Sequence, residues 1–188
     1  IHHADHPVYT VFSLWDTFRA LHPLLTLLEP ERTNDFVKTL LLHAEQTGRL
    51  PTWELWGEDT DCMIGYHAAA VIADAWQKGV RGFDPEQALA AMVRTAQLDR
   101  FGLPAYRAQG FVPSDVESES VSKTLEYAFD DACIADFARA LGKTDAAREF
   151  GARAQSWRNL FDPASGFFRA RRNGGWYAPF DPREVNFH

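Results

Sequence analysis

Apolar residues recur at every third or fourth position through most of the chain, a pattern that predicts amphipathic helices and no strand of any length. Proline and glycine mark where these stripes end, because proline disrupts a helix interior and glycine follows many helix ends. Residues 1–12, with His2, His3 and His6, are expected to form a polar lead-in. The expected helices span residues 13–28 (divided at Pro23 and closed by Pro30), 33–46 (starting at Thr33 or Asn34), 63–78, 84–98, 120–141 and 144–161.

The expected helices alternate between two kinds. Residues 63–78 are apolar on nearly all sides, which predicts a buried helix, whereas residues 84–98 carry apolar side chains on one face. The next two helices repeat this contrast. Within each pair a glycine ends the first helix, and a long loop rich in aromatic residues precedes the pair. The two loops span residues 49–61 and 99–119.

This order predicts an all-α fold with the apolar helices inside, the amphipathic helices outside, and long loops gathered at the N-termini of the inner helices. Such a layout is an α/α toroid built from helical hairpins around a central cleft. An open α-solenoid, which also stacks helix pairs, is the alternative, but it has less use for long aromatic loops. The expected helices are too few to close a ring, so residues 1–188 are expected to be a fragment of one catalytic domain.

Composition excludes some classes of function. A net charge of −7 without a basic cluster argues against a nucleic-acid partner, and no apolar run is long enough to predict a membrane span. Aromatic residues make up 13% of the chain and several fall in the expected loops, which suits a sugar-binding cleft or a protein interface. Cys62 and Cys133 are expected to be buried in helices, and the sequence leaves open whether they form a disulfide.

One carboxylate lies a turn inside the helix for which Ser120 or Ser122 is the expected N-cap. Glu126 has Tyr127 and Phe129 beside it, and aromatic surroundings raise the pKa of a carboxylic acid. The partial positive charge of a helix N-terminus lowers that pKa, and the sequence leaves the balance open. Since most helix glutamates are simply solvated, Glu126 becomes a candidate general acid only together with other site residues.

Three other polar residues each have an ordinary structural explanation, and a fourth is not given a catalytic role. His67 lies on the helix expected to be buried, where a lone histidine is more often a satisfied core residue than a functional one. Asp16 and Arg19 are three positions apart, a spacing typical of an exposed helix ion pair. Asp130 lies one turn after Glu126 on the same face, and the two carboxylates would point the same way, so Asp130 is not assigned as the catalytic base.

Five segments, taken together and in order, resemble glycoside hydrolase family 92. They are Ser13–Arg19 (with Pro23–Leu24), Cys62–His67, Lys78–Asp84, Ser122–Asp131 and Phe161–Pro163 (with Gly166–Phe167), and they cover nearly the whole chain. The resemblance implies part of an (α/α)6 catalytic domain that follows an N-terminal β-sandwich domain, with that domain and a C-terminal remainder expected but absent. It also implies a calcium-dependent exo-α-mannosidase that acts on non-reducing terminal α-mannosyl linkages of a glycan and inverts the anomeric centre.

The same resemblance implies roles for residues of this chain. Glu126 matches the family's general acid. The general base, an aspartate, and most of the calcium ligands are implied to lie after His188, so no metal ligand is assigned here and residues 1–188 alone are expected to be inactive. The implied substrate contacts are Trp15, Asp16, Arg19 and His67, with Trp56 as a stacking candidate.

Three alternatives stay open at this point. The chain could belong to another (α/α)6 glycosidase acting on α-glucosides, to a helical-repeat domain whose aromatic loops bind a protein, or to a carbohydrate-binding domain that does not cleave its ligand. The resemblance implies a periplasmic or secreted protein. Linkage preference, natural glycan and oligomeric state do not follow from the sequence.

Overall fold

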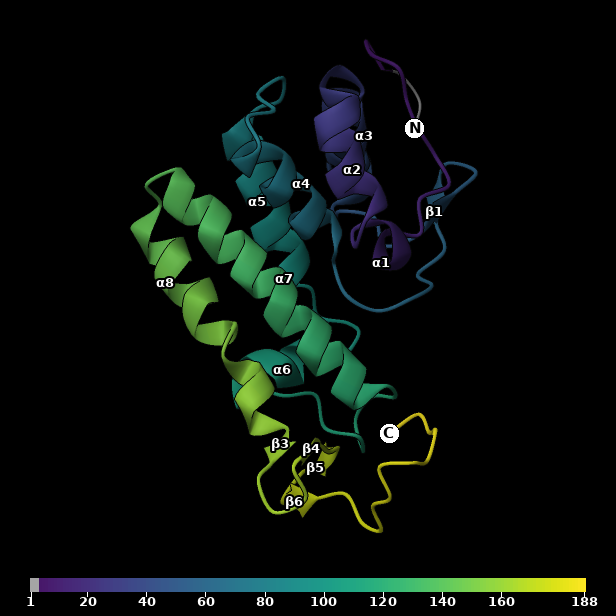
Figure 1. Cartoon of the computed structure of the whole chain (residues 1–188), viewed down its shortest axis with the longest axis vertical. Helices are drawn as coiled ribbons and strands as arrows, with labels where there is room; N and C mark the ends of the chain where they lie inside the picture. The colour runs from purple at the N-terminus through teal and green to yellow at the C-terminus, as the bar shows by residue number, and fades with distance from the viewer. Residues whose placement is uncertain (1–3) are drawn as a thin grey trace.

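The computed structural model describes residues 4–188, so His2 and His3 of the expected lead-in lie outside the described residues. Helices dominate and the strands are short (Figure 1). The helices are α1 (Leu14–Thr17), α2 (Leu21–Leu28), α3 (Pro30–Thr47), α4 (Ala68–Gln77), α5 (Pro85–Ala96), α6 (Leu103–Gln109), α7 (Ser120–Ala140) and α8 (Thr144–Arg153), followed by a 3-10 turn, η1, at Ser156–Asn159. The antiparallel strand pairs are β1 (Glu54–Leu55) with β2 (Glu58–Asp59), β3 (Phe161–Asp162) with β4 (Phe167–Phe168), and β5 (Arg171–Arg172) with β6 (Gly175–Trp176).

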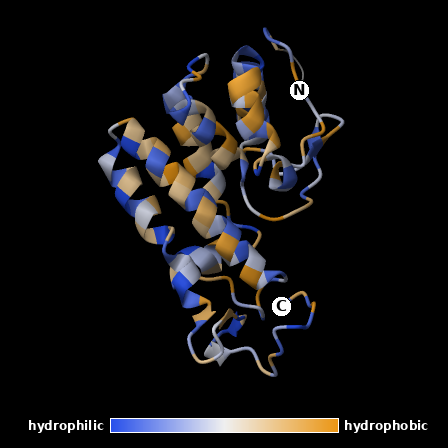
Figure 2. Cartoon of the chain, viewed as in Figure 1, coloured by the Kyte–Doolittle hydropathy of each residue, from blue (hydrophilic) through white to orange (hydrophobic). Residues whose placement is uncertain are grey.

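The helices pack largely in consecutive pairs. α7 lies along α8 and against α4, α2 packs on α3, and α4 contacts α5 (Figure 1). α4 is buried along most of its length, whereas α8 mixes polar and apolar positions (Figure 2) and buries Phe150. α4 and α7 therefore form an inner layer, and α5 and α8 an outer one. The predicted all-α architecture of helical hairpins, arranged as in a toroid, is confirmed.

The start of α5 follows the local sequence. Asp84 precedes the helix, and its carboxylate accepts hydrogen bonds from the backbone N–H groups of Glu86 (2.8 Å) and Gln87 (3.3 Å). Pro85 occupies the first helical position, where the missing N–H would have had no partner in the helix. Short-range chemistry is sufficient to place this helix, and the prediction for it is confirmed.

The first two expected helices begin and end at other residues than predicted. The break lies at residues 18–20, between α1 and α2, and not at Pro23. Pro23 is in the first turn of α2, where a backbone N–H has no intrahelical partner and proline is tolerated. Pro30 begins α3 instead of closing the helix before it, again as a first-turn proline. The predicted start at Thr33 or Asn34 is therefore wrong by about one turn.

The segment that leads into α4 differs most from the prediction. The expected helix start at Met63 is replaced by a loop, in which Met63 and Gly65 have φ angles of 69° and 85°. Asp61, which the sequence predicts as the cap of this helix, lies well before α4, and its carboxylate pairs with Arg49 and Arg100. This loop is held by side-chain contacts to α7 that hydrophobic periodicity does not reveal.

The two cysteines are free thiols in different surroundings. Cys62 is exposed in the loop before α4, so the prediction that it is buried in a helix is wrong. Cys133 lies in α7 and is partly buried, and burial raises the pKa of its thiol.

Three further differences concern the second half of the chain. α6 was missed; it lies inside the expected loop, with Gly102 and Gly110 at its ends in the left-handed conformation. Glu119, also left-handed, occupies the N-cap position of α7, and the Ser120 hydroxyl is buried without a hydrogen-bond partner. The last expected helix ends well before Phe161, because a 3-10 turn follows α8.

No helix in the described part of the chain is long and apolar enough to cross a membrane.

Candidate active site

Four charged or titratable side chains from three segments meet beside the first turns of α7. Glu126 and Asp130 lie in α7, His67 immediately precedes α4, and Arg19 lies between α1 and α2. One oxygen of Glu126 is 3.3 Å from Arg19 Nη2, and the other is 3.2 Å from His67 Nε2. On the far side of the imidazole, His67 Nδ1 is 2.8 Å from Asp130 Oδ1. These four residues, here called the Glu126 cluster, alternate in sign from Arg19 to Asp130.

Exposure decreases along the Glu126 cluster. The Arg19 side chain is 48% exposed and that of Glu126 20%, whereas His67 and Asp130 are 1% and 0% exposed. Only the Arg19–Glu126 end can therefore meet a ligand without rearrangement. The simple explanation of Glu126 as a solvated helix residue does not fit, because most of its side chain is covered and its two oxygens face Arg19 and His67.

The loop before α4 fixes the imidazole of His67. A Cβ atom built on Gly65 would lie 2.5 Å from His67 Nε2, and Gly65 has a φ of +85°, so this position requires glycine. Phe18 stacks on the imidazole, with the ring centroids 4.2 Å apart and the planes inclined by 14°. Backbone contact, ring stacking and the Asp130 carboxylate together leave the ring little freedom to turn.

Two consecutive loop residues, Tyr66 and His67, are bound by two consecutive aspartates of α7. Asp130 accepts a hydrogen bond from the Tyr66 backbone N–H (2.7 Å) in addition to its contact with His67. Asp131, the next residue, accepts one from the Tyr66 hydroxyl (2.6 Å). The Tyr66 ring also stacks on Tyr127, which points into the core and does not form a wall beside Glu126. The consecutive aspartates thus align the consecutive Tyr66 and His67 with the helix.

These contacts decide the protonation of the cluster. Burial disfavours the imidazolium of His67, but the charge and hydrogen bond of Asp130 and the nearby Glu126 outweigh it and raise the pKa of His67 to about 9. Partial burial favours the neutral acid of Glu126, yet His67 and then Arg19 outweigh it and lower the pKa of Glu126. His67 Nε2 and Glu126 lie at ion-pair distance without the alignment of a well-directed hydrogen bond.

α1 carries two of the predicted substrate contacts and leads to a third. Arg19 Nε donates a hydrogen bond to the Trp15 carbonyl (3.0 Å), and the guanidinium carbon lies 4.7 Å from the Trp15 ring centroid. Asp16 is exposed and accepts a hydrogen bond from the Ser13 hydroxyl (2.5 Å), while Arg19 pairs with Glu126 instead of Asp16. The structure therefore joins Trp15 and Arg19 to the site and leaves Asp16 facing solvent.

Trp56 lies apart from these residues. It occupies the turn between β1 and β2 and is 91% exposed. Within residues 4–188 its ring forms no hydrogen bond or aromatic contact with the Glu126 cluster. A stacking role for Trp56 stays a prediction.

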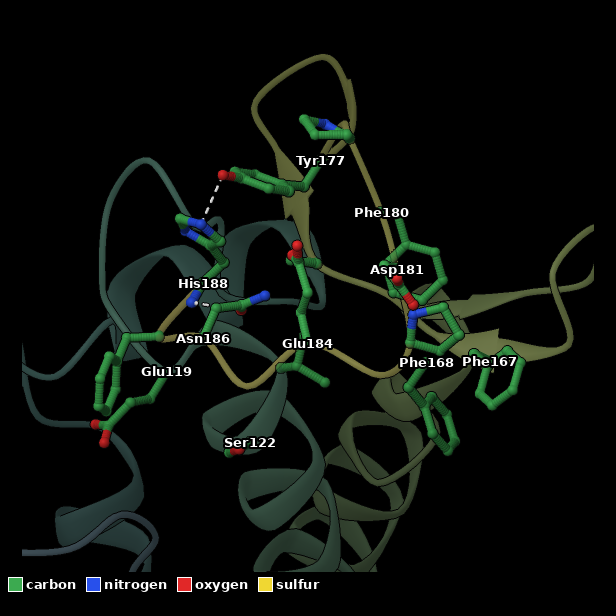
Figure 3. A pocket seen from close by; sticks show the side chains of 15 residues that line it. Glu119, Ser122, Phe167, Phe168, Tyr177, Phe180, Asp181, Glu184, Asn186 and His188 are labelled. Carbon is green, nitrogen blue, oxygen red and sulfur yellow. Dashed lines mark hydrogen bonds between the residues drawn. The ribbon is translucent and has the colours of Figure 1, made fainter.

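A cavity of about 340 Å³ opens at the N-terminal end of α7. Ser122, one helical turn before Glu126 and on the same side of the helix, lines it together with side chains from residues 167–188, whereas the residues of the Glu126 cluster do not line it. Figure 3 shows Ser122 at one side of this hollow and Tyr177 and His188 at the other, joined by a 2.6 Å hydrogen bond. The lining mixes aromatic rings with acidic and amide groups, a combination suited to a ligand with apolar faces and many hydroxyls.

The acidic side chains of the described residues are not gathered at one point. Among them, no group of three or more His, Cys, Asp or Glu side chains is arranged to hold a metal ion. In the acidic loop before α4, Asp59 and Asp61 are both paired with Arg49, which leaves their oxygens unsuited to a cation.

Comparison with known proteins identifies the family. The profile described as the glycosyl hydrolase family 92 catalytic domain matches residues 1–188. The chain belongs to glycosyl hydrolase family 92. A family GH92 α-mannosidase from Bacteroides thetaiotaomicron, solved in complex with mannoimidazole, is 48% identical with a TM-score of 0.92, and the match covers 96% of this chain and 24% of that one. A family GH92 inverting mannosidase from B. thetaiotaomicron VPI-5482 is 37% identical, with a TM-score of 0.91 and coverage of 96% and 26%.

A more distant relative comes from Arthroderma benhamiae and is described as an uncharacterized secreted glycosidase. It is 28% identical over an alignment of 139 positions, and the match covers 65% of this chain and 18% of that protein. The chain thus spans about a quarter of the length of the two solved structures named above. The predicted membership in family 92 is confirmed.

Sequence reasoning missed the residues that support the family 92 motifs. Asp130 was considered only as a possible base, and neither Gly65 nor Phe18 was connected with His67. A usable signal was present, since a Tyr-His pair and an Asp-Asp pair stand in two separate motifs. Matching donors to acceptors between motifs would have suggested the pairing, but not which aspartate holds which residue.

Proposed function

We propose that the family 92 protein containing this chain hydrolyses non-reducing terminal α-mannosyl linkages with inversion, and that Glu126 is its general acid. The similarity to an α-mannosidase solved with mannoimidazole and to an inverting mannosidase supports the substrate and the stereochemistry. The observation that carries the role of Glu126 is its position. It is the carboxylate of the cluster that is both held by two cations and open to a ligand.

Inverting hydrolysis needs two carboxyl groups on opposite sides of the scissile bond. One protonates the departing glycosidic oxygen while the other activates a water, and their separation of about 6.5–9.5 Å leaves room for that water. Arg19 and His67 fix the two oxygens of Glu126, which sets the direction from which its proton reaches a sugar. Trp15, against the Arg19 guanidinium, supplies an aromatic face close to the same end of the site.

Asp130 is unsuited to be the base that this reaction needs. It is 0% exposed, and its oxygens are occupied by His67 Nδ1 and the Tyr66 backbone N–H. No water could reach it without dismantling the contacts that hold His67. The base is therefore proposed to come from a part of the enzyme outside these residues.

We also propose that the enzyme requires calcium and is secreted or periplasmic, and both proposals rest on the family alone. Ligands for calcium would come from outside the described residues, since these do not gather a metal-binding group. A secreted or periplasmic location agrees with the relative described as a secreted glycosidase. Loss of α-mannosidase activity with a chelator, and its recovery with added calcium, would test the metal requirement.

The acid role is tested by Glu126→Gln in the full-length enzyme. We expect turnover of an α-mannoside with a poor leaving group to fall by about 10²–10⁴-fold, while a substrate with an acidic phenol leaving group, which needs little protonation, retains much more of its rate. Glu149→Gln, at an exposed position of α8, is the matched control and should behave as wild type. Near-wild-type hydrolysis of the poor leaving group by Glu126→Gln would refute the assignment.

The substrate is tested separately. An α-mannosidase should cleave α-mannosides far faster than the matching α-glucosides, and the rival (α/α)6 glucosidase would show the reverse order. A non-catalytic carbohydrate-binding or protein-binding domain would give no hydrolysis of either substrate in the full-length protein.

A further inference from the structure

The proposed acid has an unusual environment for its task. A general acid must carry a proton at the working pH, yet Glu126 lies between two cationic side chains that favour its ionised form. An acid in a purely apolar pocket keeps its proton by burial, but here the two cationic side chains outweigh the effect of partial burial. The proton must be held close by in another way.

We infer that Glu126 and His67 share one proton, and that His67, oriented by Asp130, is a positioning residue that keeps this proton beside Glu126 at neutral and mildly alkaline pH. The inference rests on the proposed role of Glu126 as general acid and assigns a new role to His67 and Asp130. His67, with 1% of its side chain exposed, then acts through Glu126 and not by contacting the sugar.

The geometry specifies where the proton lies. Asp130 Oδ1 is 2.8 Å from Nδ1 of His67, so Nδ1 carries a hydrogen that it donates to the carboxylate. The second ionisable hydrogen of the imidazolium is then on Nε2, which lies 3.2 Å from Glu126 Oε2. Because the imidazole is buried and Glu126 is partly exposed, the path between His67 and solvent runs through the Glu126 carboxylate.

The transfer balances without any other reactant. The pair is at ion-pair distance without an aligned hydrogen bond, so the Glu126 carboxylate first rotates to bring Oε2 into line with Nε2–H. The N–H bond at His67 Nε2 then breaks with its electron pair staying on nitrogen, and an O–H bond forms at Glu126 Oε2. Glu126 then donates this proton to the glycosidic oxygen as the bond from that oxygen to the anomeric carbon breaks. After the product leaves, the Glu126–His67 pair takes one proton from water and returns to its starting state.

The charges around His67 explain why the proton is retained. Glu126 and Asp130 face it from α7, Arg19 faces Glu126 from the segment between α1 and α2, and the packed rings of Phe18 and Phe129 carry no charge. Two carboxylates against one imidazole raise the pKa of His67 to about 9. A carboxylic acid alone would lose its proton near pH 4.3, so the pair stays loaded over a much wider range.

The experiment is the pH dependence of kcat/KM for a disaccharide α-mannoside, measured on the full-length enzyme from about pH 5 to pH 10. We expect the alkaline limb of the wild-type profile to report the shared proton. In His67→Gln this limb should move down by about two pH units or more, toward the range of an isolated carboxylic acid. Asp130→Asn should move it in the same direction by a smaller amount, because the imidazole loses one of its two carboxylates.

The control is His22→Gln, which alters another histidine that is 1% exposed and lies outside the Glu126 cluster. Its alkaline limb should coincide with that of wild type. A pH midpoint is unaffected by a folded fraction that is the same at every pH, and circular dichroism recorded at each pH of the profile shows whether this holds for each variant. An unchanged limb in His67→Gln, with Glu126→Gln still impaired, would overturn the shared proton and leave the acid role standing. Full activity of Glu126→Gln on the disaccharide would instead refute the proposed function itself.

Discussion

Two clusters of polar residues on α7 use the same kind of side chain for different ends. In the Glu126 cluster, carboxylates face a histidine and one end is open to solvent. One residue after Asp130, Asp131 is 0% exposed and accepts hydrogen bonds from the hydroxyls of Tyr66 (2.6 Å) and Tyr106 (2.9 Å) and from Arg153 Nε (3.0 Å). These last four residues are called the tyrosine cluster below.

The difference between the clusters lies in what their cations can do. Arg153 stays protonated at any physiological pH, and burial raises the pKa of Tyr66 and Tyr106, so these three groups exchange no proton. Burial raises the pKa of Asp131 to about 6, but Asp131 has no exposed partner in its cluster to pass a proton to. His67 can gain and lose a proton, and Glu126 can pass it outward. The comparison teaches that burial of a carboxylate does not by itself indicate function. A histidine partner that can titrate, together with a carboxylate exposed to solvent, is the better indication.

The largest effect is expected from breaking the tyrosine cluster. Asp131→Ala leaves Arg153 and two tyrosine hydroxyls without their acceptor, and removing one partner of a buried pair costs about 3–5 kcal/mol of folding free energy. Urea unfolding of the full-length enzyme measures it. Asp136→Ala, which removes an exposed pair with Arg139 on the same helix, should change stability by less than about 1 kcal/mol. Equal effects of the two substitutions would contradict the distinction.

The pH dependence of stability should reveal the histidine of the Glu126 cluster, because its counterpart in the tyrosine cluster, Arg153, does not titrate. The folded pKa of His67, about 9, lies above its ordinary value of 6.5. Its contribution is therefore fully present below about pH 6.5 and is lost as pH rises through about 9, with a size of up to roughly 3 kcal/mol. Thermal unfolding at several pH values measures this slope, and His67→Gln should remove it. A slope that persists unchanged in His67→Gln would show that other groups cause it.

Glycine substitutions sharpen the comparison at the loop that supports His67. Gly65→Ala places a Cβ 2.5 Å from His67 Nε2, whereas at Gly79, which has a similar φ of +91°, an added Cβ meets nothing within 4 Å. In both variants the left-handed backbone conformation costs about 1–2 kcal/mol of folding free energy. We expect only Gly65→Ala to lower kcat on a poor leaving group, by displacing the imidazole from Glu126. Equal losses of kcat in both variants would mean that backbone strain, not His67, is responsible.

The smallest effect on stability is expected at Trp56. Because this side chain is 91% exposed, Trp56→Ala should change the free energy of unfolding by no more than about 0.5 kcal/mol. If the ring stacks on substrate, KM for a mannoside should rise while kcat changes little. Wild-type kinetic constants in this variant would remove Trp56 from the substrate contacts.

Much of the helical framework follows from local pattern. Asp84 and Pro85 define the start of α5 through capping that involves neighbours in the sequence. The alternation of wholly apolar and one-faced helices predicts which helices are inside, because apolar area must be covered whatever the details of packing. The ordered motifs added the family, and with it Glu126 as the residue to examine.

The loop before α4 and the state of the Glu126 cluster were decided by tertiary structure. Met63 was predicted to begin a helix because its neighbours are apolar, but contacts from Asp130 and Asp131 to the segment at Tyr66 and His67 hold a loop there instead. The protonation of Glu126 likewise depends on His67 and Arg19, which lie far from it in the sequence. A pattern along one chain records which faces avoid water, whereas the pKa of a group depends on charges a few ångströms away in space.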